Sequence, residues 1–318
     1  MARPSAGRSV WPMFRTIIIG YDGPGRGDEA AALAALLRDP RKGTLLLTSA
    51  YPLAPAMTAG GYFAPEEIER LRDETNTMLA AARDAIPAKE RTRIRAVASA
   101  SPPRVLTEVA EAEHADLVVV GSSHRGTIGR VLPGTTAERL LHGAPCAVAV
   151  APRGYRGGPI RHIGVAYDGS PEAEAALHAA EALALELRAA LTVYCAVEPT
   201  PPSASMIAAG TGAEWPSQTA NDRARHLLWA VSDNAPQGLK PETMLLRGEP
   251  AAEIAARAHG VIDLLFTGSR GYGPLRRALL GSVSGALVRD AGCPVVVTPH
   301  TAIAQDDPAP KTARAVHA

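Results

Sequence analysis

The sequence repeats itself at a spacing of about 147 residues, and this repeat constrains the fold more than any other feature. With 318 residues, the chain has room for two domains of about 150 residues each. The residues that recur 147 positions apart are Asp116 and Asp263, Gly121 and Gly268, Gly134 and Gly281, and Cys146 and Cys293, while Asp22 and Asp168 lie 146 apart. We therefore expect two copies of one domain with helices and strands of nearly equal length.

Each copy is predicted to alternate β-strands with α-helices. Short β-branched or apolar runs, typical of buried strands, alternate with longer stretches whose apolar residues recur at helical spacing. This alternation predicts an α/β fold with two tandem, doubly wound, five-stranded parallel sheets of Rossmann-like type. The expected strands are residues 16–21, 44–50, 93–99, 117–120, 147–151, 162–167, 191–197, 242–246, 264–267 and 295–298. The expected helices are 28–38, 68–86, 101–113, 135–142, 171–188, 220–234, one opening at 250, and 282–290.

Polar turns follow the first and fourth strands of each copy. Asp22 and Asp168 come directly after the first strands, and Gly121 and Gly268 come directly after the fourth strands. In a doubly wound sheet, ligands bind beyond the carboxyl ends of the strands, where the winding reverses. Strands one and four should therefore be neighbours, which gives strand order 3-2-1-4-5 in each copy and places each aspartate across a crevice from a glycine.

The loop after the fourth strand of the second copy has the outline of a phosphate site. It contains Gly268 and Gly271 and ends in Gly281 and Ser282, which open a helix. Glycines let backbone N–H groups approach a ligand, and the free N–H groups and dipole of a helix start favour an anion. The carboxylate of Asp168 on the opposite side suits a ribose hydroxyl or an adenine edge better than a phosphate. These features together predict a nucleotide as the ligand.

A plainer interpretation of Asp22 and Asp168 stays open. An aspartate before glycine often forms a turn by accepting a hydrogen bond from its own backbone two residues on. The occurrence of this pair at the expected mouth of both copies favours the binding interpretation as much as the turn interpretation.

Both halves resemble domains of the universal stress protein family, and the whole chain resembles its tandem form. The resemblance covers about residues 14–152 and 160–299. The ATP-binding branch carries the pattern Gly, two residues, Gly, nine residues, Gly, then Ser or Thr, and the second copy carries it complete. The resemblance implies an adenine nucleotide alpha hydrolase-like fold, ATP as the ligand with or without Mg²⁺, and pairing of the last strands of the two halves.

The resemblance also implies which residues surround the nucleotide in the second copy. Asp168 is expected to contact the nucleoside, and Ala196, at the end of the second strand, is expected to line the adenine pocket. The other expected cofactor-binding residues are Gly169, Gly248, Thr267, Gly268, Arg270, Gly271, Gly281, Ser282, Val283 and Ser284.

The first copy departs from the family pattern at His124, which stands where the second glycine belongs. If that position needs a positive φ, a residue other than glycine costs about 1–2 kcal/mol, which corresponds to as much as roughly thirtyfold in affinity. Gly126 and Gly129 offer the loop another route. We expect the first site to bind ATP more weakly than the second. The expected residues of the first site are Asp22, Ala50, Gly121, His124, Gly134, Thr135 and Thr136.

Charge and composition argue against several other functions. The formal net charge is +1 and only 20% of residues are charged, so the chain has no overall field to attract nucleic acid or an anionic membrane. No apolar run approaches the length of a membrane span, and residues 1–13 lack the apolar centre of a signal peptide. The three cysteines cannot form a disulfide framework and suit a reducing compartment. We expect a cytoplasmic protein without nucleic-acid or membrane partners.

The expected division of the chain follows from these segments. Residues 1–13 are expected to be an N-terminal extension, 14–152 and 160–299 the two universal stress protein domains, and 153–159 a linker. Residues 300–318 are expected to be a disordered tail, because they hold too few large apolar residues to pack.

An enzymatic role is not indicated by any group of residues in the sequence. Residues 129–136 nearly form a P-loop, but Thr135 occupies the position of its lysine. The leading hypothesis is a nucleotide-dependent regulator or sensor of a stress response, with at most weak ATP hydrolysis. Two alternatives stay open, namely a slow ATPase or phosphotransfer protein that uses Asp168 or Ser282, and an interaction scaffold that binds no nucleotide. A homodimer of the tandem chain also stays open.

Overall fold

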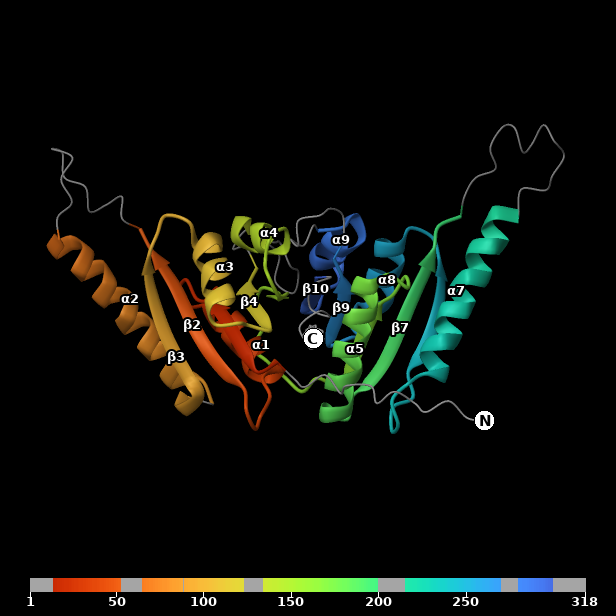
Figure 1. Cartoon of the computed structure of the whole chain (residues 1–318), viewed down its shortest axis with the longest axis horizontal. Helices are drawn as coiled ribbons and strands as arrows, with labels where there is room; N and C mark the ends of the chain where they lie inside the picture. The colour runs from red at the N-terminus through yellow and green to blue at the C-terminus, as the bar shows by residue number, and fades with distance from the viewer. Residues whose placement is uncertain are drawn as a thin grey trace, which may run out of the picture.

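The computed structural model describes residues 14–52, 65–87, 89–122, 134–199, 215–269 and 280–299. The expected site residues His124, Arg270 and Gly271 lie outside these ranges, as do the expected terminal segments 1–13 and 300–318. In the described ranges, helices and strands alternate through both halves of the chain (Figure 1).

The described strands of the first half lie within two residues of their expected bounds. They are β1 (Thr16–Gly20), β2 (Thr44–Tyr51), β3 (Thr92–Ala98), β4 (Leu117–Gly121) and β5 (Ala147–Ala151). The helices between them are α1 (Arg26–Leu37), α2 (Pro65–Ala85), α3 (Pro102–Ala112) and α4 (Thr135–Leu141), with the short 3₁₀ helix η2 (Lys89–Arg91) before β3.

The second half repeats this series of elements. Its described strands are β6 (His162–Ala166), β7 (Ala190–Val197), β8 (Glu242–Arg247), β9 (Leu264–Gly268) and β10 (Val295–Thr298). Its described helices are α5 (Pro171–Leu187), α7 (Trp215–Asp233), α8 (Pro250–Ala258) and α9 (Ser282–Asp290). Helix α7 begins five residues before its expected start. Pro216 in its first turn is compatible with this start, since a missing N–H group breaks no helical hydrogen bond there.

The strands form one ten-stranded sheet in the order β3-β2-β1-β4-β5-β10-β9-β6-β7-β8. Each half therefore has the order 3-2-1-4-5, with parallel pairing inside the half. The two halves meet where β5 pairs antiparallel with β10, so that Val150 lies opposite Val295 and Val148 opposite Val297. The two five-stranded sheets that we expected are thus two parts of a single sheet.

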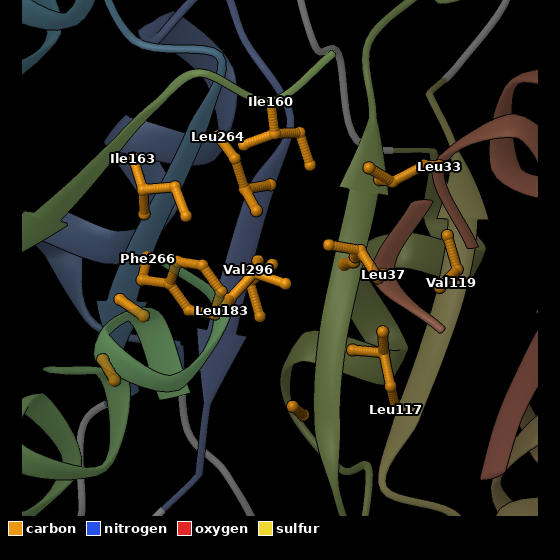
Figure 2. Close-up of a cluster of buried hydrophobic side chains, with 14 of the residues drawn as sticks. Leu33, Leu37, Leu117, Val119, Ile160, Ile163, Leu183, Leu264, Phe266 and Val296 are labelled. Atoms are coloured by element: carbon orange, nitrogen blue, oxygen red, sulfur yellow. The ribbon is translucent and has the colours of Figure 1, made fainter. Parts of the chain in front are cut away.

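Helices cover both faces of this sheet and bury an apolar core on each. Helices α1, α2, α5 and α7 pack on one face, and α3, α4, α8 and α9 pack on the other. Figure 1 shows α2 and α7 at opposite ends of the molecule, with β10 near the middle. Figure 2 shows the first core, in which Leu33 of α1 and Leu117 of β4 belong to the same cluster as Phe266 of β9 and Val296 of β10. The core is therefore continuous across the join between the halves.

Two aspartates fix the fourth strand of each half to the first. Asp263 accepts the backbone N–H groups of Arg161 and His162 on one oxygen, Oδ2, at 2.8 and 2.9 Å. Asp116 accepts the N–H groups of residues 15 and 16 in the same way, both at 2.8 Å. These bonds align the two strands whose carboxyl ends form the candidate site.

Helix α1 begins at Arg26, two residues before its expected start, and Gly25 is its N-cap residue. Asp28 lies in the first turn instead, where its carboxylate accepts the N–H of Gly25 at 2.9 Å and the hydroxyl of Tyr21 at 2.8 Å. Burial and the bond with Asp28 raise the pKa of Tyr21 above its usual range. Asp28 therefore joins the end of β1 to the start of the helix that follows it.

Candidate functional site

A cavity of about 190 Å³ opens beyond the carboxyl ends of β6 and β9. It is called the second cavity, because it belongs to the second half of the chain. These strands are neighbours, with Ala166 opposite Thr267. Asp168, which follows β6, and Gly268, which ends β9, both line the cavity, and Ala196 of β7 lines it as well. The carboxylate and the glycine that the sequence predicted to face each other thus border one space.

The first turn of α9 lies on the same cavity, where Gly281, Ser282, Val283 and Ser284 all line it. No side chain in the described part of the chain caps α9, whereas Ser170 caps α5 through its side chain. The first N–H groups of an uncapped helix have no intrahelical partner, and together with the helix dipole they favour an anion. The cavity therefore presents an anion-binding surface on its α9 side.

The backbone of Gly281 does not need glycine, since its φ of −70° and ψ of 162° are open to any residue. Gly281 lines the cavity and has no side chain that could enter it. The hydroxyl of Ser284 donates to the carbonyl oxygen of Gly281 at 3.2 Å. The hydroxyl of Ser284 is therefore engaged within the helix start.

Gly268 allows a helix to pack against the end of β9. A Cβ atom on Gly268 would lie 2.7 Å from the backbone nitrogen of Ala173 and 2.7 Å from the carbonyl carbon of Glu172. The hydroxyl of Thr298 donates to the carbonyl oxygen of Glu172 at 3.1 Å and holds the same turn of α5 in place. This packing role, which the sequence did not indicate, accounts for Gly268 without any ligand.

Asp168 forms a turn and also lines the cavity, so the two interpretations of this residue are compatible. Its Oδ1 accepts the N–H of Ser170 at 2.9 Å, and the residue is exposed. Gly169 has a φ of +76°, a conformation that favours glycine. Gly169 and Gly248 are not among the described residues that line the cavity, and they shape the turns beside it.

Burial favours the neutral forms of Tyr167, which lines the second cavity, and of Cys195, which precedes Ala196 in β7. Burial, and next the negative charge of Asp168, raise the pKa of the Cys195 thiol to about 11. Burial and a hydrogen bond to Glu174 raise the pKa of Tyr167 above its usual range. Neither group is an activated nucleophile at neutral pH, because the thiolate is the reactive form of cysteine. In the described part of the chain, no group of three or more His, Cys, Asp or Glu side chains is placed to hold a metal ion.

Another cavity, of about 130 Å³, occupies the corresponding place in the first half, beyond the ends of β1 and β4, and is called the first cavity. Arg26, which the sequence analysis did not select, also lines it and forms an ion pair with Asp22. The spacing of four residues at a helix start was the signal that indicated such a pair. Of the expected first-site residues, those that line this cavity are Asp22, Ala50, Gly121, Gly134, Thr135 and Thr136.

The model of the universal stress protein family matches residues 13–152 and 159–299. The chain belongs to the universal stress protein family. A universal stress protein of Mycobacterium tuberculosis is 29% identical over 207 residues, which cover 61% of this chain and 68% of that protein. One of Mycolicibacterium smegmatis is 28% identical over 302 residues, covering 88% and 96%. The crystal structure of a universal stress protein from Archaeoglobus fulgidus has a TM-score of 0.64 at 17% identity, covers 90% of this chain and 98% of its own, and shows the shared fold.

In this universal stress protein, several cavity residues of the second half were missed by reasoning from the sequence. Pro250 and Ile254 come from the start of α8 and add an apolar wall near Ala196. They follow Gly248, and the proline that opens a helix there was the available signal. The other residues that line the cavity without having been predicted are Ala166, Tyr167, Ser170, Ala173 and Ser269. In the described ranges, no helix is both long enough and apolar enough to cross a membrane.

Proposed function

We propose that this universal stress protein binds ATP in the second cavity and acts as a nucleotide-dependent regulator of a stress response. The observation that carries the proposal is that Asp168 and the uncapped first turn of α9 border the same cavity. The helix start suits phosphate, and the carboxylate suits the hydroxyl and amino donors of a nucleoside. Ala196, Pro250 and Ile254 supply an apolar wall for the base.

The proposed ligand residues of each cavity are those that the sequence analysis named and the structure describes. A Mg²⁺ ion that arrives with the nucleotide takes phosphate oxygens, waters and one or two carboxylates, and Asp168 is a carboxylate at the second cavity. In the second cavity the proposed residues are Asp168, Ala196, Thr267, Gly268, Gly281, Ser282, Val283 and Ser284, with Gly169 and Gly248 in the turns beside it. In the first cavity they are Asp22, Ala50, Gly121, Gly134, Thr135 and Thr136.

The proposal includes the domain boundaries and the compartment. We assign the two domains to residues 14–152 and 160–299, with 153–159 as the linker between them. We assign the protein to the cytoplasm, and the three cysteines support this, since all are buried free thiols that suit a reducing compartment.

Calorimetric titration with ATP tests the proposal, with Gly281→Glu as the decisive variant. A glutamate at this position adds a negative charge and fills the space before α9, while the backbone there accepts any residue. We expect the wild type to bind ATP and Gly281→Glu to lose the tighter site with unchanged circular dichroism. Gly134→Glu, the matched change in the first half, should keep that tighter site. Equal ATP binding by wild type and Gly281→Glu contradicts the proposal.

Phosphate release measures whether the protein turns ATP over. We expect a rate no greater than that of Gly281→Glu, because the described cavity residues include no activated nucleophile. A rate well above this control favours the slow ATPase, and the absence of any nucleotide binding favours the interaction scaffold.

A further inference from the structure

The floors of the two cavities differ in chemistry. The first cavity reaches down to Gly20 of β1 and Thr48 of β2, which are paired in register. The same positions in the second half hold Ala166 and Tyr194, which are also paired. The Tyr194 side chain is buried in the core and is not among the described residues that line the second cavity. Thr48 thus places a small hydroxyl side chain at the first cavity, whereas its counterpart Tyr194 is buried in the core of the second half.

The hydroxyl of Thr48 is buried and lacks a hydrogen-bond partner among the described residues. Thr48 is only 1% exposed, and it lines the first cavity. A buried polar group without a partner is unfavourable, so such groups in folded proteins call for an explanation. A polar atom of a ligand at the cavity floor would provide the missing partner.

Among the described residues, the first cavity is lined by an arginine, whereas the second is not. Arg26 pairs with Asp22, and the Nε atom of Arg26 is buried without a partner among the described residues. Glu172 holds the repeat position of Arg26, 146 residues on. Asp168, the counterpart of Asp22, makes no ion pair within the described ranges and accepts an N–H group of its own turn. The first cavity therefore presents a guanidinium beside its carboxylate, whereas the carboxylate at the second cavity has no such partner within the described ranges.

We infer that the first cavity selects a nucleotide whose base carries carbonyl acceptors, an oxopurine of the guanine type. This inference rests on the proposed function, since it takes the ligand to be a nucleotide. A guanidinium donates two parallel hydrogen bonds to O6 and N7 of guanine, whereas adenine places an amino donor at the position of O6. The Thr48 hydroxyl can donate to, or accept from, a further polar atom of the base. The two cavities of one chain are thereby assigned to different nucleotides.

Titration of the full-length Gly281→Glu protein with GMP and AMP tests the inference, because this substitution is expected to prevent nucleotide binding in the second cavity. We expect GMP to bind more tightly than AMP. Thr48→Val and Arg26→Gln, each added to this background, should weaken GMP binding about tenfold, the effect of one hydrogen bond. Thr48→Val should leave AMP binding nearly unchanged, and Arg26→Gln should leave it unchanged or raise it a few fold, because it frees the carboxylate of Asp22. Thr48→Ser, which keeps the hydroxyl, should retain GMP affinity.

The melting temperature of the ligand-free protein separates a binding role of Thr48 from a structural one. A hydroxyl without a partner stabilises nothing, so Thr48→Val should melt at the same temperature as the wild type or higher. A lower melting temperature would indicate a structural role and would overturn the inference.

Four further results also decide the matter. AMP binding as tightly as GMP in the Gly281→Glu background, or GMP affinity untouched by Thr48→Val and Arg26→Gln, overturns the oxopurine assignment. A first cavity that binds neither nucleotide, while wild-type protein binds ATP in the second, overturns this inference and leaves the proposed function standing. Failure of ATP to bind either cavity overturns the proposed function itself.

Discussion

The backbone nitrogen of Ala173 lies 2.7 Å from the place that a Cβ atom on Gly268 would occupy. The first turn of α5 thus rests directly on the end of β9, and a side chain of any size at position 268 must push the two apart. Because both elements border the second cavity, their close approach determines its shape.

Replacement of Gly268 by alanine should lower the free energy of unfolding by about 1–3 kcal/mol, the usual cost of forcing a methyl group into a packed site. Gly143→Ala is a matched control, since the nearest atom to its added Cβ, the carbonyl oxygen of Arg139, is 3.5 Å away. Urea denaturation of both variants measures the difference. Equal stability of the two variants would show that α5 can shift without cost.

Removal of the Asp263 carboxylate should destabilise the entry to β6. Asp263→Ala leaves the N–H groups of Arg161 and His162 without their acceptor, and we expect a loss of about 1 kcal/mol in the free energy of unfolding. Asp263→Asn keeps an acceptor oxygen and should lose less. Asp116→Ala should lose as much stability as Asp263→Ala, because Asp116 accepts the same two kinds of backbone bond. Urea denaturation measures the free energy of unfolding. Alanine variants as stable as the wild type would contradict this account.

Stability should fall at alkaline pH, because buried thiols and phenols are held neutral in the folded chain. Burial raises the pKa of Cys195 from 9.0 to about 11 and that of Cys293 from 9.0 to about 12, and burial raises that of Tyr155 from 10.0 to about 12. The folded-state pKa values lie above the unfolded values. The stabilisation is therefore complete below pH 9 and is lost as the pH rises towards 12.

Melting temperatures measured between pH 7 and pH 11 test this prediction. Cys195→Ala removes one of the titrating groups and should flatten the decline between pH 9 and pH 11. A wild-type melting temperature that stays constant over the whole range would contradict the predicted linkage.

The first cavity should bind ATP more weakly than the second, because Arg26 already occupies the carboxylate of Asp22. We expect Gly281→Glu to reduce ATP binding more than Gly134→Glu does. In the Gly281→Glu background, Arg26→Gln frees Asp22 and should raise ATP affinity a few fold. Competitive titration that shows equal occupancy of the two cavities would refute the ranking.

The fold of each half could be predicted from the sequence, because the apolar periodicity indicates the same series of helices and strands in both copies of the repeat. Helix α9 and strand β10 have the expected bounds to the residue. The pairing of β5 with β10 has no trace in local periodicity, since it joins segments far apart in the chain, and only the family resemblance implied it.

The candidate site was predictable in its backbone but less so in its side chains. Asp168, Gly268 and Gly281 follow from spacing, since the carboxyl ends of neighbouring parallel strands meet at one edge of the sheet. Arg26 and Thr48 do not, because their importance depends on which side-chain atoms lack a partner after packing. The spacing of residues in the sequence does not predict which polar atoms lack a partner. The expectations at His124, Arg270 and Gly271 lie outside the described residues and stay predictions.

The antiparallel join of β5 and β10 has a consequence for either half in isolation. If the halves were separated, each would have a valine-rich edge strand with unpaired backbone N–H and C=O groups. Such an edge can pair with a strand of another chain. In the intact chain, the covalent link holds the partner strand at a high effective concentration, so dilution of the protein does not separate β5 from β10.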